Sequence, residues 1–271
     1  MLIRVKPKQS LGQNFLIDGN IARKIVHSLR LDENDVVVEI GPGHGALTQH
    51  LAGRVRHLLA IEIDNRVVGD LQAVFASEKV TILHQDFLDI HLPEWQHRYK
   101  SKLRLVGNIP YHLTSPILFK AFDEWGSIQD LTIMIQQEVA HRITAKPNTK
   151  KYGILAVLSQ FYGIPKLLFN VSPNCIYPKP KVMSTVVYLR FHEQLPENIN
   201  EKILTTIVKT TFGKRRKTLR NGLKYLPYDE PVIKKIIAEL EFPLEKRPEQ
   251  LSIHQFIQLS HQIESIITEN R

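Results

Sequence analysis

The chain has 271 residues, 43% of them hydrophobic, so it can bury a sizeable core, and we expect one large domain with a smaller one attached. No apolar run approaches the roughly 20 residues that span a bilayer, and the N-terminal sequence carries charges where a secretory signal would be apolar. We therefore expect a cytoplasmic protein without a membrane partner. Because Cys175 is the only cysteine, an internal disulfide and a cysteine-based zinc site are excluded, and no metal is expected from the scattered histidines.

The charge balance favours a polyanionic partner. The chain contains 36 Lys and Arg against 27 Asp and Glu, a formal charge of +9. Basic residues recur at 4–8, 141–151 and 179–181, and they are densest between Lys209 and Lys224, where no acid occurs. Solubility alone could explain the net charge, but this clustering favours a phosphate backbone.

The first two thirds of the chain alternate short apolar runs with amphipathic segments of helical length. The runs are too continuous for half-exposed strands, so they predict a mostly parallel sheet with helices on both faces, an α/β Rossmann-like fold. A later run at 184–192 predicts a further strand, antiparallel and closing the sheet. The other predicted strands are 36–40, 57–63, 79–85, 103–107 and 131–136, and the predicted helices are 46–53, 65–76 and 115–125.

A glycine-rich turn follows the first of these strands. Gly41, Gly43 and Gly45 come directly after Glu39 and an isoleucine, with the spacing G-x-G-x-G. Dinucleotide-binding folds use G-x-G-x-x-G, so the spacing argues against a pyrophosphate cofactor and for S-adenosylmethionine, with S-adenosylhomocysteine as product. The alternative is an ordinary strand-to-helix turn, which does not need three glycines.

Acidic residues end the next two strands. Glu62 could accept hydrogen bonds from both ribose hydroxyls of a cofactor, whereas Asp64 should point the other way by strand alternation. Asp86 could accept from an adenine amino group, with Phe87 as an apolar wall. Either acid could instead cap a helix.

The fourth strand runs into Asn108, Ile109, Pro110 and Tyr111. Alone, this stretch is typical of a strand-ending turn with a core tyrosine. At the ligand edge of a parallel sheet, the Asn108 oxygen and the carbonyl of Ile109 or Pro110 could accept both N–H bonds of an exocyclic amine, while Tyr111 stacks on the flipped base. Catalysis would then consist mostly of positioning.

Strand signals stop after 192–198, and the segments 199–212, 230–242 and 252–263 are spaced like helices. We therefore expect domains at 1–195 and 196–271, the first a methyltransferase domain with a basic N-terminal segment and the second a small helical RNA-binding domain. A helix from Lys214 would bury Leu219, Leu223 and Leu226 and align Arg216, Arg220 and Lys224 on another face. A solvated helix face is the alternative to RNA contact. The predicted RNA-binding residues here are Lys214, Arg215, Arg216, Lys217 and Arg220.

Along essentially its whole length the chain resembles the ribosomal RNA adenine dimethyltransferases, especially their bacterial small-subunit branch. The blocks that carry the resemblance are "GQNFLID" (12–18), "VVEIGPGHGALT" (37–48), "IEID" (61–64), "QDFL" (85–88), "GNIPYHLTSPIL" (107–118), "QQEVAHRI" (136–143), "YPKPKVMSTVV" (177–187) and "FGKRRKTLRN" (212–221).

The resemblance implies methyl transfer from S-adenosylmethionine to two adjacent adenosines in the 3′-terminal hairpin loop of small-subunit (16S) rRNA, two methyls on each amine. It also implies a role in small-subunit biogenesis, with the rRNA or an immature small subunit as partner; we expect a monomer without an obligatory protein partner. By motif, Asn14 and Leu16 would cover the cofactor, Gly41 would lie under its methionine part, Glu62 would hold the ribose, Asp86 the adenine, and Asn108 would bridge cofactor and target.

One position departs from the family pattern. Members commonly carry an aromatic residue where this chain has Ile176, and that aromatic is thought to close over the target base. Either the adjacent Tyr177 substitutes for it, or Tyr111 grips the base. Two other functions stay open: a large-subunit rRNA methyltransferase of the macrolide-resistance type, and a non-catalytic assembly or RNA-binding factor. The block at 212–221 favours the small-subunit branch.

Overall fold

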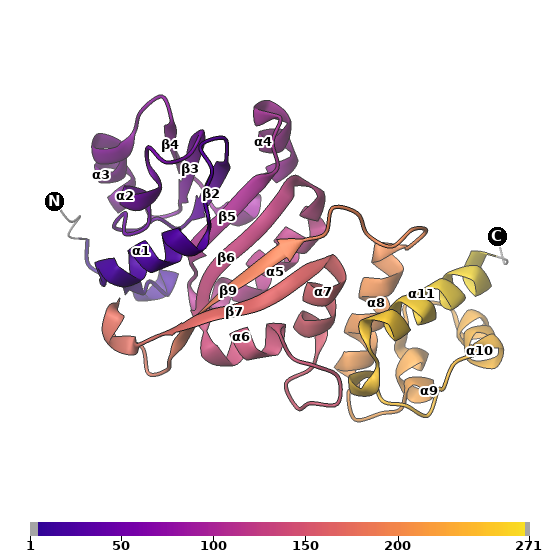
Figure 1. The fold of residues 1–271 in the computed structure, drawn as a ribbon. Helices are drawn as coiled ribbons and strands as arrows, with labels where there is room; N and C mark the ends of the chain where they lie inside the picture. The colour runs from indigo at the N-terminus through magenta and orange to yellow at the C-terminus, as the bar shows by residue number, and fades with distance from the viewer. Residues whose placement is uncertain (1–4, 269–271) are drawn as a thin grey trace. The chain divides into compact units, whose positions relative to one another are not determined.

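The structure is a computed structural model that describes residues 5–268, and its chain path is drawn in Figure 1. The chain forms two compact units. The first contains the chain up to Ala140 together with Gly163–Glu193, and the second contains His141–Tyr162 together with the chain from Gln194 onward. The segment 141–162 lies within the range expected for the first domain but groups with the C-terminal helices. Each unit is described by itself.

A seven-stranded mixed sheet forms the centre of the first unit, which confirms the predicted α/β fold class. Five neighbouring strands are parallel, and two antiparallel strands follow at one side. The sheet order is β4 (Val80–His84), β3 (His57–Glu62), β2 (Val36–Ile40), β5 (Leu103–Asn108), β6 (Ile128–Gln136), β9 (Ser184–Phe191) and β7 (Gly163–Val171).

Strand β7 was not predicted, and it occupies the edge of the sheet that we assigned to β9. Most β7 side chains are exposed or half-buried, including Ile164 and Leu167, so the segment lacks the buried apolar run of the other strands. Pro165 interrupts it further, as is common on edge strands. β9 is antiparallel as expected, but the prediction that it closes the sheet is wrong, because it pairs with both β6 and β7.

Helices cover the sheet. On one face, α1 (Gly19–Ser28), α2 (Thr48–Leu51) and α3 (Asn65–Phe75) share an apolar cluster with Val37 and Val106. The alternate residues of β2 are equally buried, as expected for a sheet covered on both faces. The remaining helices of this part of the chain are α4 (Leu92–Tyr99), α5 (Thr114–Asp123) and α6 (Gln137–Ile143).

The strand order reverses direction between β2 and β5. The chain leaves β2 toward β3 and β4, whereas β5 leads toward β6, so the carboxyl ends of β2 and β5 form the switch point at which such sheets bind ligands. Ile40 is paired with Gly107 at this point. A Cβ on Gly107 would lie 2.7 Å from the Ile40 carbonyl oxygen, so only glycine allows the two strands to approach so closely.

The second unit is helical. Its core includes Tyr152, whose hydroxyl donates to the Leu251 carbonyl at 2.9 Å, and Phe256. The helices predicted at 199–212, 230–242 and 252–263 are confirmed. The helices are α7 (Ile154–Tyr162), α8 (Glu201–Gly213), α9 (Leu219–Gly222), α10 (Glu230–Glu239) and α11 (Ile253–Thr268).

The predicted continuous helix from Lys214 is wrong. α8 ends at Gly213, and a turn separates it from the single-turn helix α9. A short 3-10 turn, Leu223–Tyr225, follows α9. Leu219, Leu223 and Leu226 are nevertheless buried, because the two short turns present them to the core in place of one helix face. Among residues 5–268, no helix has the length and apolar character needed to cross a membrane.

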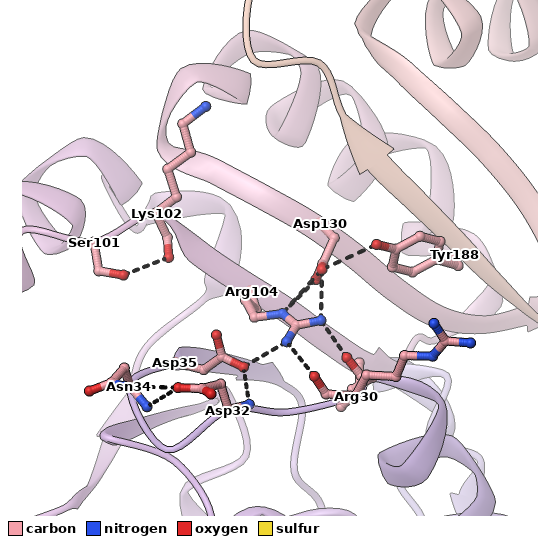
Figure 2. Close-up of polar contacts among 10 residues, drawn as sticks. Arg30, Asp32, Asn34, Asp35, Ser101, Lys102, Arg104, Asp130 and Tyr188 are labelled. Atoms are coloured by element: carbon pink, nitrogen blue, oxygen red, sulfur yellow. Dashed lines mark hydrogen bonds and ion pairs between the residues drawn. The ribbon is translucent and has the colours of Figure 1, made fainter.

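A buried ion cluster joins the amino ends of the strands to the end of α1 (Figure 2). The Arg104 guanidinium contacts Asp130 at 2.8 Å and Asp35 at 2.6 Å. It also donates to the carbonyls of Leu29 and Arg30. All five of its N–H bonds therefore have an acceptor, so the charge is buried without an unpaired donor.

Removing Arg104 should destabilise the fold. Arg104→Ala leaves Asp130 buried and without its cation, so we expect the free energy of unfolding to fall by about 3–5 kcal/mol. Urea denaturation measures the change. Arg190→Ala is the control, since this arginine is exposed on β9 opposite Asp130, and it should change the free energy by less than about 0.5 kcal/mol. Equal effects of the two substitutions would contradict the role of the cluster.

Candidate functional site

A cavity of about 280 Å³ lies at the switch point. Its walls come from the N-terminal segment, the glycine-rich turn after β2, and the ends of β3, β4 and β5. The structure brings every predicted cofactor residue to this one cavity, whereas Tyr111 is not among the lining residues. The predicted site residues that line it are Asn14, Leu16, Gly41, Gly43, Glu62, Asp86, Phe87, Asn108 and Pro110.

The glycine-rich turn leaves bare backbone on the cavity wall. Gly41 has a φ of +65°, and a Cβ built on it would meet nothing within 4 Å, so this side of the residue faces open space. Gly43 has a φ of +53°, and its Cβ would press on the Phe15 ring at 3.0 Å. The turn therefore lets a ligand lie directly against the main chain at Gly41.

Glu62 is oriented toward the same wall by two backbone N–H groups. Its carboxylate oxygens accept from Gly43 N at 2.9 Å and from Asp64 N at 2.8 Å. Each oxygen keeps a further lone pair for a hydroxyl donor. Burial raises the pKa of Glu62, and the backbone N–H donors oppose that rise.

Asp64 has a different environment. Its carboxylate binds Arg66 and Gln13 and caps α3, and it does not line the cavity. Asp64 points away from the cavity, as expected, and caps a helix, whereas Glu62, for which capping was the alternative, lies on the cavity wall. Arg66 holds the pKa of Asp64 well below its usual range.

Glu39 lines the cavity too, although we gave it no role from the sequence. The side chain is 1% exposed, and the Thr48 hydroxyl donates to it at 2.7 Å. Burial, with a smaller contribution from nearby Glu62, raises the pKa of Glu39 to about 8. Its position before the glycine turn was the available signal, but residue type alone does not indicate that the carboxyl is buried.

Asp86 both caps a turn and lines the cavity, so the two alternatives given for it from the sequence hold together. It caps the 3-10 turn Phe87–Asp89 by accepting from Leu88 N at 2.9 Å, and it lines the cavity. Phe87 is buried and supplies apolar wall beside it. The cap fixes the carboxylate while the second oxygen remains available to a ligand.

Asn108 is held by the N-terminal segment. Its Nδ2 donates to the Asn14 carbonyl at 2.6 Å, which leaves Oδ1 as the acceptor on the cavity wall. The Asn14 side chain in turn donates to the Gly12 carbonyl at 3.1 Å. Reasoning from residue types gave no indication of this link, because it joins positions 94 apart in the sequence.

Tyr111 begins the 3-10 turn Tyr111–Leu113. Its hydroxyl bonds the Ser184 hydroxyl at 2.9 Å, and the residue is half-buried. The Pro110 carbonyl accepts from Leu113 N at 2.9 Å and so forms part of the turn. The bond to Ser184 restrains the position of the Tyr111 ring. Base stacking by Tyr111 stays a prediction.

A second cavity adjoins the first one. It shares Phe15, Leu16, His44 and Ala46 with the first cavity. Its wall includes Tyr177, which belongs to β8 (Ile176–Tyr177) and pairs with β1 (Phe15–Leu16).

The two residues of β8 differ in exposure. Ile176 is 2% exposed and packs in the core, whereas Tyr177 is 57% exposed. Of the two, Tyr177 is therefore the side chain that a substrate can reach.

The predicted RNA-binding residues of the second unit differ in environment. Arg215 pairs with Glu249 and donates to the carbonyls of Lys150 and Thr149, so its guanidinium holds the unit together. Arg220 pairs with Glu245 at 3.1 Å. The expected i, i+4 row does not form, because the helix that would carry it is absent. The exposed basic residues of the set are Lys214, Arg216, Lys217 and Arg220.

The raised pKa of Glu39 predicts a pH dependence of stability. A carboxyl whose pKa rises on folding stabilises the protein below its unfolded pKa, near 4.5, and that contribution is lost as the pH rises toward about 8. The unliganded protein should therefore lose more stability between pH 5 and pH 8 than Glu39→Gln does. Urea denaturation at four pH values measures both slopes. Glu94→Gln, at an exposed site, should match the wild-type slope; parallel curves for Glu39→Gln and wild type would contradict the expectation.

Comparison with known proteins gives one consistent result. The chain matches the ribosomal RNA adenine dimethylase family over residues 4–264. A protein of Caldanaerobacter subterraneus is 36% identical over 98% of this chain and 100% of its own, and one of Chlamydia caviae is 38% identical over 97% and 94%. A Clostridium botulinum protein is 39% identical over 97% and 96%. Each of the three is named ribosomal RNA small subunit methyltransferase A.

Solved structures support the fold. A dimethyladenosine transferase of Plasmodium falciparum aligns with a TM-score of 0.77 at 22% identity, over 93% of this chain and 98% of its own. The 23S rRNA methyltransferase ErmE aligns with a TM-score of 0.67 at 22% identity, over 92% and 99%. With the family match and the three close relatives, these findings show that the chain belongs to the ribosomal RNA adenine dimethylase family.

Proposed function

We propose that this chain dimethylates the exocyclic amines of two adjacent adenosines in the 3′-terminal hairpin loop of small-subunit rRNA. Family membership supports the reaction, and the names of relatives 36–39% identical to it support the small-subunit substrate. The likeness to a 23S rRNA methyltransferase is one of fold, at 22% identity, and gives the large-subunit alternative no specific support. Asn108 and Glu62 at one cavity argue against a non-catalytic factor.

The cavity residues fit S-adenosylmethionine, the methyl donor of the family. When bound, it supplies the methyl group as a sulfonium electrophile. The open backbone at Gly41 gives the ligand room to approach, and Glu62 has lone pairs for ribose hydroxyls. In this assignment Asp86 accepts from the adenine amino group, Phe87 forms an apolar wall, and Asn14 and Leu16 cover the ligand from the N-terminal segment.

The fixed amide of Asn108 is the observation that carries the proposal. Because Nδ2 is bound to the Asn14 carbonyl, Oδ1 is presented as an acceptor toward the cavity. An amine that donates one N–H to Oδ1 and another to a backbone carbonyl is drawn out of conjugation with its ring, and its lone pair becomes available for attack. The side chain acts by position, so it needs no shifted pKa.

Ile109 is the better candidate for the second acceptor. The Pro110 carbonyl already accepts from Leu113 N within its turn, whereas Ile109 uses its N–H to bond the Met134 carbonyl. The Ile109 carbonyl belongs to the residue that directly follows Asn108, the last residue of β5. Transfer of the methyl group leaves a positive charge on the amine nitrogen, and this cation is acidic, so it can release its proton to water without a dedicated base.

The proposal extends to the partner and the place of action. An immature small subunit is the proposed substrate particle, with a monomer acting in the bacterial cytoplasm where ribosomes are assembled. In the second unit, exposed Lys214, Arg216 and Lys217 are proposed to contact phosphates, whereas Arg215 is proposed to act mainly through its internal contacts. Tyr177, as the exposed aromatic, is proposed to stack on the target RNA.

Replacing Asn108 tests the proposed chemistry. Asn108→Ala should keep the fold and RNA binding but lower the rate of methyl transfer by about 100-fold or more, the usual effect of removing one positioned polar group. Asn170→Ala is the control, because that amide accepts from Thr185 away from the cavity, and it should leave the rate unchanged.

The substrate is tested with the wild-type protein. Unmethylated small subunits, large subunits and naked rRNA are each incubated with labelled S-adenosylmethionine, and the labelled adenosines are mapped. Absence of label from small subunits would overturn the proposed substrate, and full activity of Asn108→Ala would overturn the proposed role of the amide.

The cofactor site is tested with a matched pair of glycines. Gly41→Ala and Gly53→Ala both place a Cβ at positive φ with nothing within 4 Å, so they should cost similar stability. Only Gly41 lines the cavity, so only Gly41→Ala should weaken S-adenosylmethionine binding, by roughly tenfold or more, in isothermal titration calorimetry. Equal affinities of the two variants would show that the ligand does not lie against Gly41.

A further inference from the structure

Five basic side chains surround a hollow on one face of the first unit. Arg23, Lys24 and His27 come from α1, and His50 and Arg54 come from α2 and the turn after it. Val26 completes the lining of this hollow, which measures about 370 Å³ and is called here the α1–α2 groove. Within the part of the chain that the structure describes, no carboxylate lines it.

The charges in the α1–α2 groove are poorly neutralised. Among residues 5–268, neither Lys24 nor Arg54 forms an ion pair with a carboxylate, and Arg23 bonds the Asn20 amide at 2.7 Å. Asp18, which caps α1, is the acid that acts on Arg23. Burial lowers the pKa of His50, and Arg23 and Arg54 lower it further, as expected where the local potential is positive.

Helix stability does not explain this arrangement. A cation in the last turn of α1, such as His27, interacts favourably with the helix dipole. Arg23 lies in the first half of α1, where the dipole disfavours a cation, so the dipole does not explain its position. Like charges around a hollow whose lining holds no carboxylate repel one another, so an anion bound there would reduce this repulsion.

The α1–α2 groove is formed by the same two helices that line part of the second cavity. The second cavity is lined by Gly19 and Ala22 of α1 and by Gln49 of α2. Ala22 directly precedes Arg23, and Gln49 directly precedes His50, so the linings of the groove and of the second cavity are neighbours in sequence on both helices. From Ala22 to His27 the helix rises about 7.5 Å, so the distance to be bridged is short.

We propose that the α1–α2 groove binds backbone phosphates of the same RNA strand whose adenosine enters the cofactor cavity. This inference rests on the proposed function and adds a phosphate-binding surface to the catalytic unit itself. Arg23 and Arg54 can each bind a phosphate through two parallel N–H bonds, and Lys24 adds a point charge. Such contacts fix the register of the strand without distinguishing its bases.

The test compares two triple variants of the full chain. Arg23→Gln, Lys24→Gln and Arg54→Gln together remove three groove charges, and Lys79→Gln, Lys100→Gln and Lys166→Gln remove three exposed charges outside the groove. The substrates are unmethylated small subunits and a hairpin RNA that carries the two adenosines with flanking nucleotides. The readouts are KM for each RNA at several salt concentrations, kcat, and the affinity for S-adenosylmethionine.

The groove variant should raise KM for the hairpin roughly tenfold to a hundredfold. The slope of log affinity against log salt concentration should become shallower by the amount expected for about three phosphate contacts. Its kcat and cofactor affinity should match the wild type, which also shows that it is folded. The control variant should change KM by less than about threefold. With a hairpin trimmed to its loop, the KM values of the groove variant and the wild type should differ much less, because this RNA lacks the flanking phosphates.

The two proposals fail in different ways. If the wild type labels adenosines and the groove variant keeps the wild-type KM and salt dependence, the groove inference is wrong and the proposed function stands. If the groove variant loses binding to small subunits but not to the hairpin, the groove contacts a part of the particle other than the strand that carries the target adenosines, which also overturns the inference. If the wild type labels no adenosine in any RNA, the proposed function itself fails.

Discussion

The close approach of β2 and β5 is the constraint on which the rest of the site depends. Ile40 and Gly107 pair at the switch point, and a side chain on Gly107 would collide with the Ile40 carbonyl. Because the two strands meet so closely, the glycine turn after β2 and Asn108 at the end of β5 line one cavity. Every proposed contact with cofactor and target amine follows from that geometry.

The sequence predicts the interior of the sheet better than its edge. Strands covered on both faces must be continuous apolar runs, so β2, β3 and β5 were recognisable from residue type. β7 was not recognisable, because it lies at the edge of the sheet and most of its side chains are exposed or half-buried, so it lacks a continuous apolar run. The gathering of Glu62, Asp86 and Asn108 at one edge was predictable for the same topological reason, since parallel strands end together.

What the sequence could not give is the pairing of distant groups. The Asn14–Asn108 bond and the burial of Glu39 depend on packing between segments that residue type does not encode. The basic segment after α8 was predicted with the wrong local structure. Its spacing suited a helix, but Arg215 is used to hold the second unit together, and the leucines are buried by two separate turns. The RNA-binding role of this basic segment stays a prediction, and the helix predicted for it is wrong.

The hydrogen bond between Asn108 and the Asn14 carbonyl links the orientation of the amide to the position of the N-terminal segment. The N-terminal segment that lines the cavity is held by two side chains that do not line it. Asp64, at the start of α3, accepts from Gln13, and Arg66 donates to the Lys6 carbonyl. Displacing this segment would remove the hydrogen bond that orients the Asn108 amide. The orientation of the amide oxygen thus depends on the position of a segment 94 residues away in the sequence.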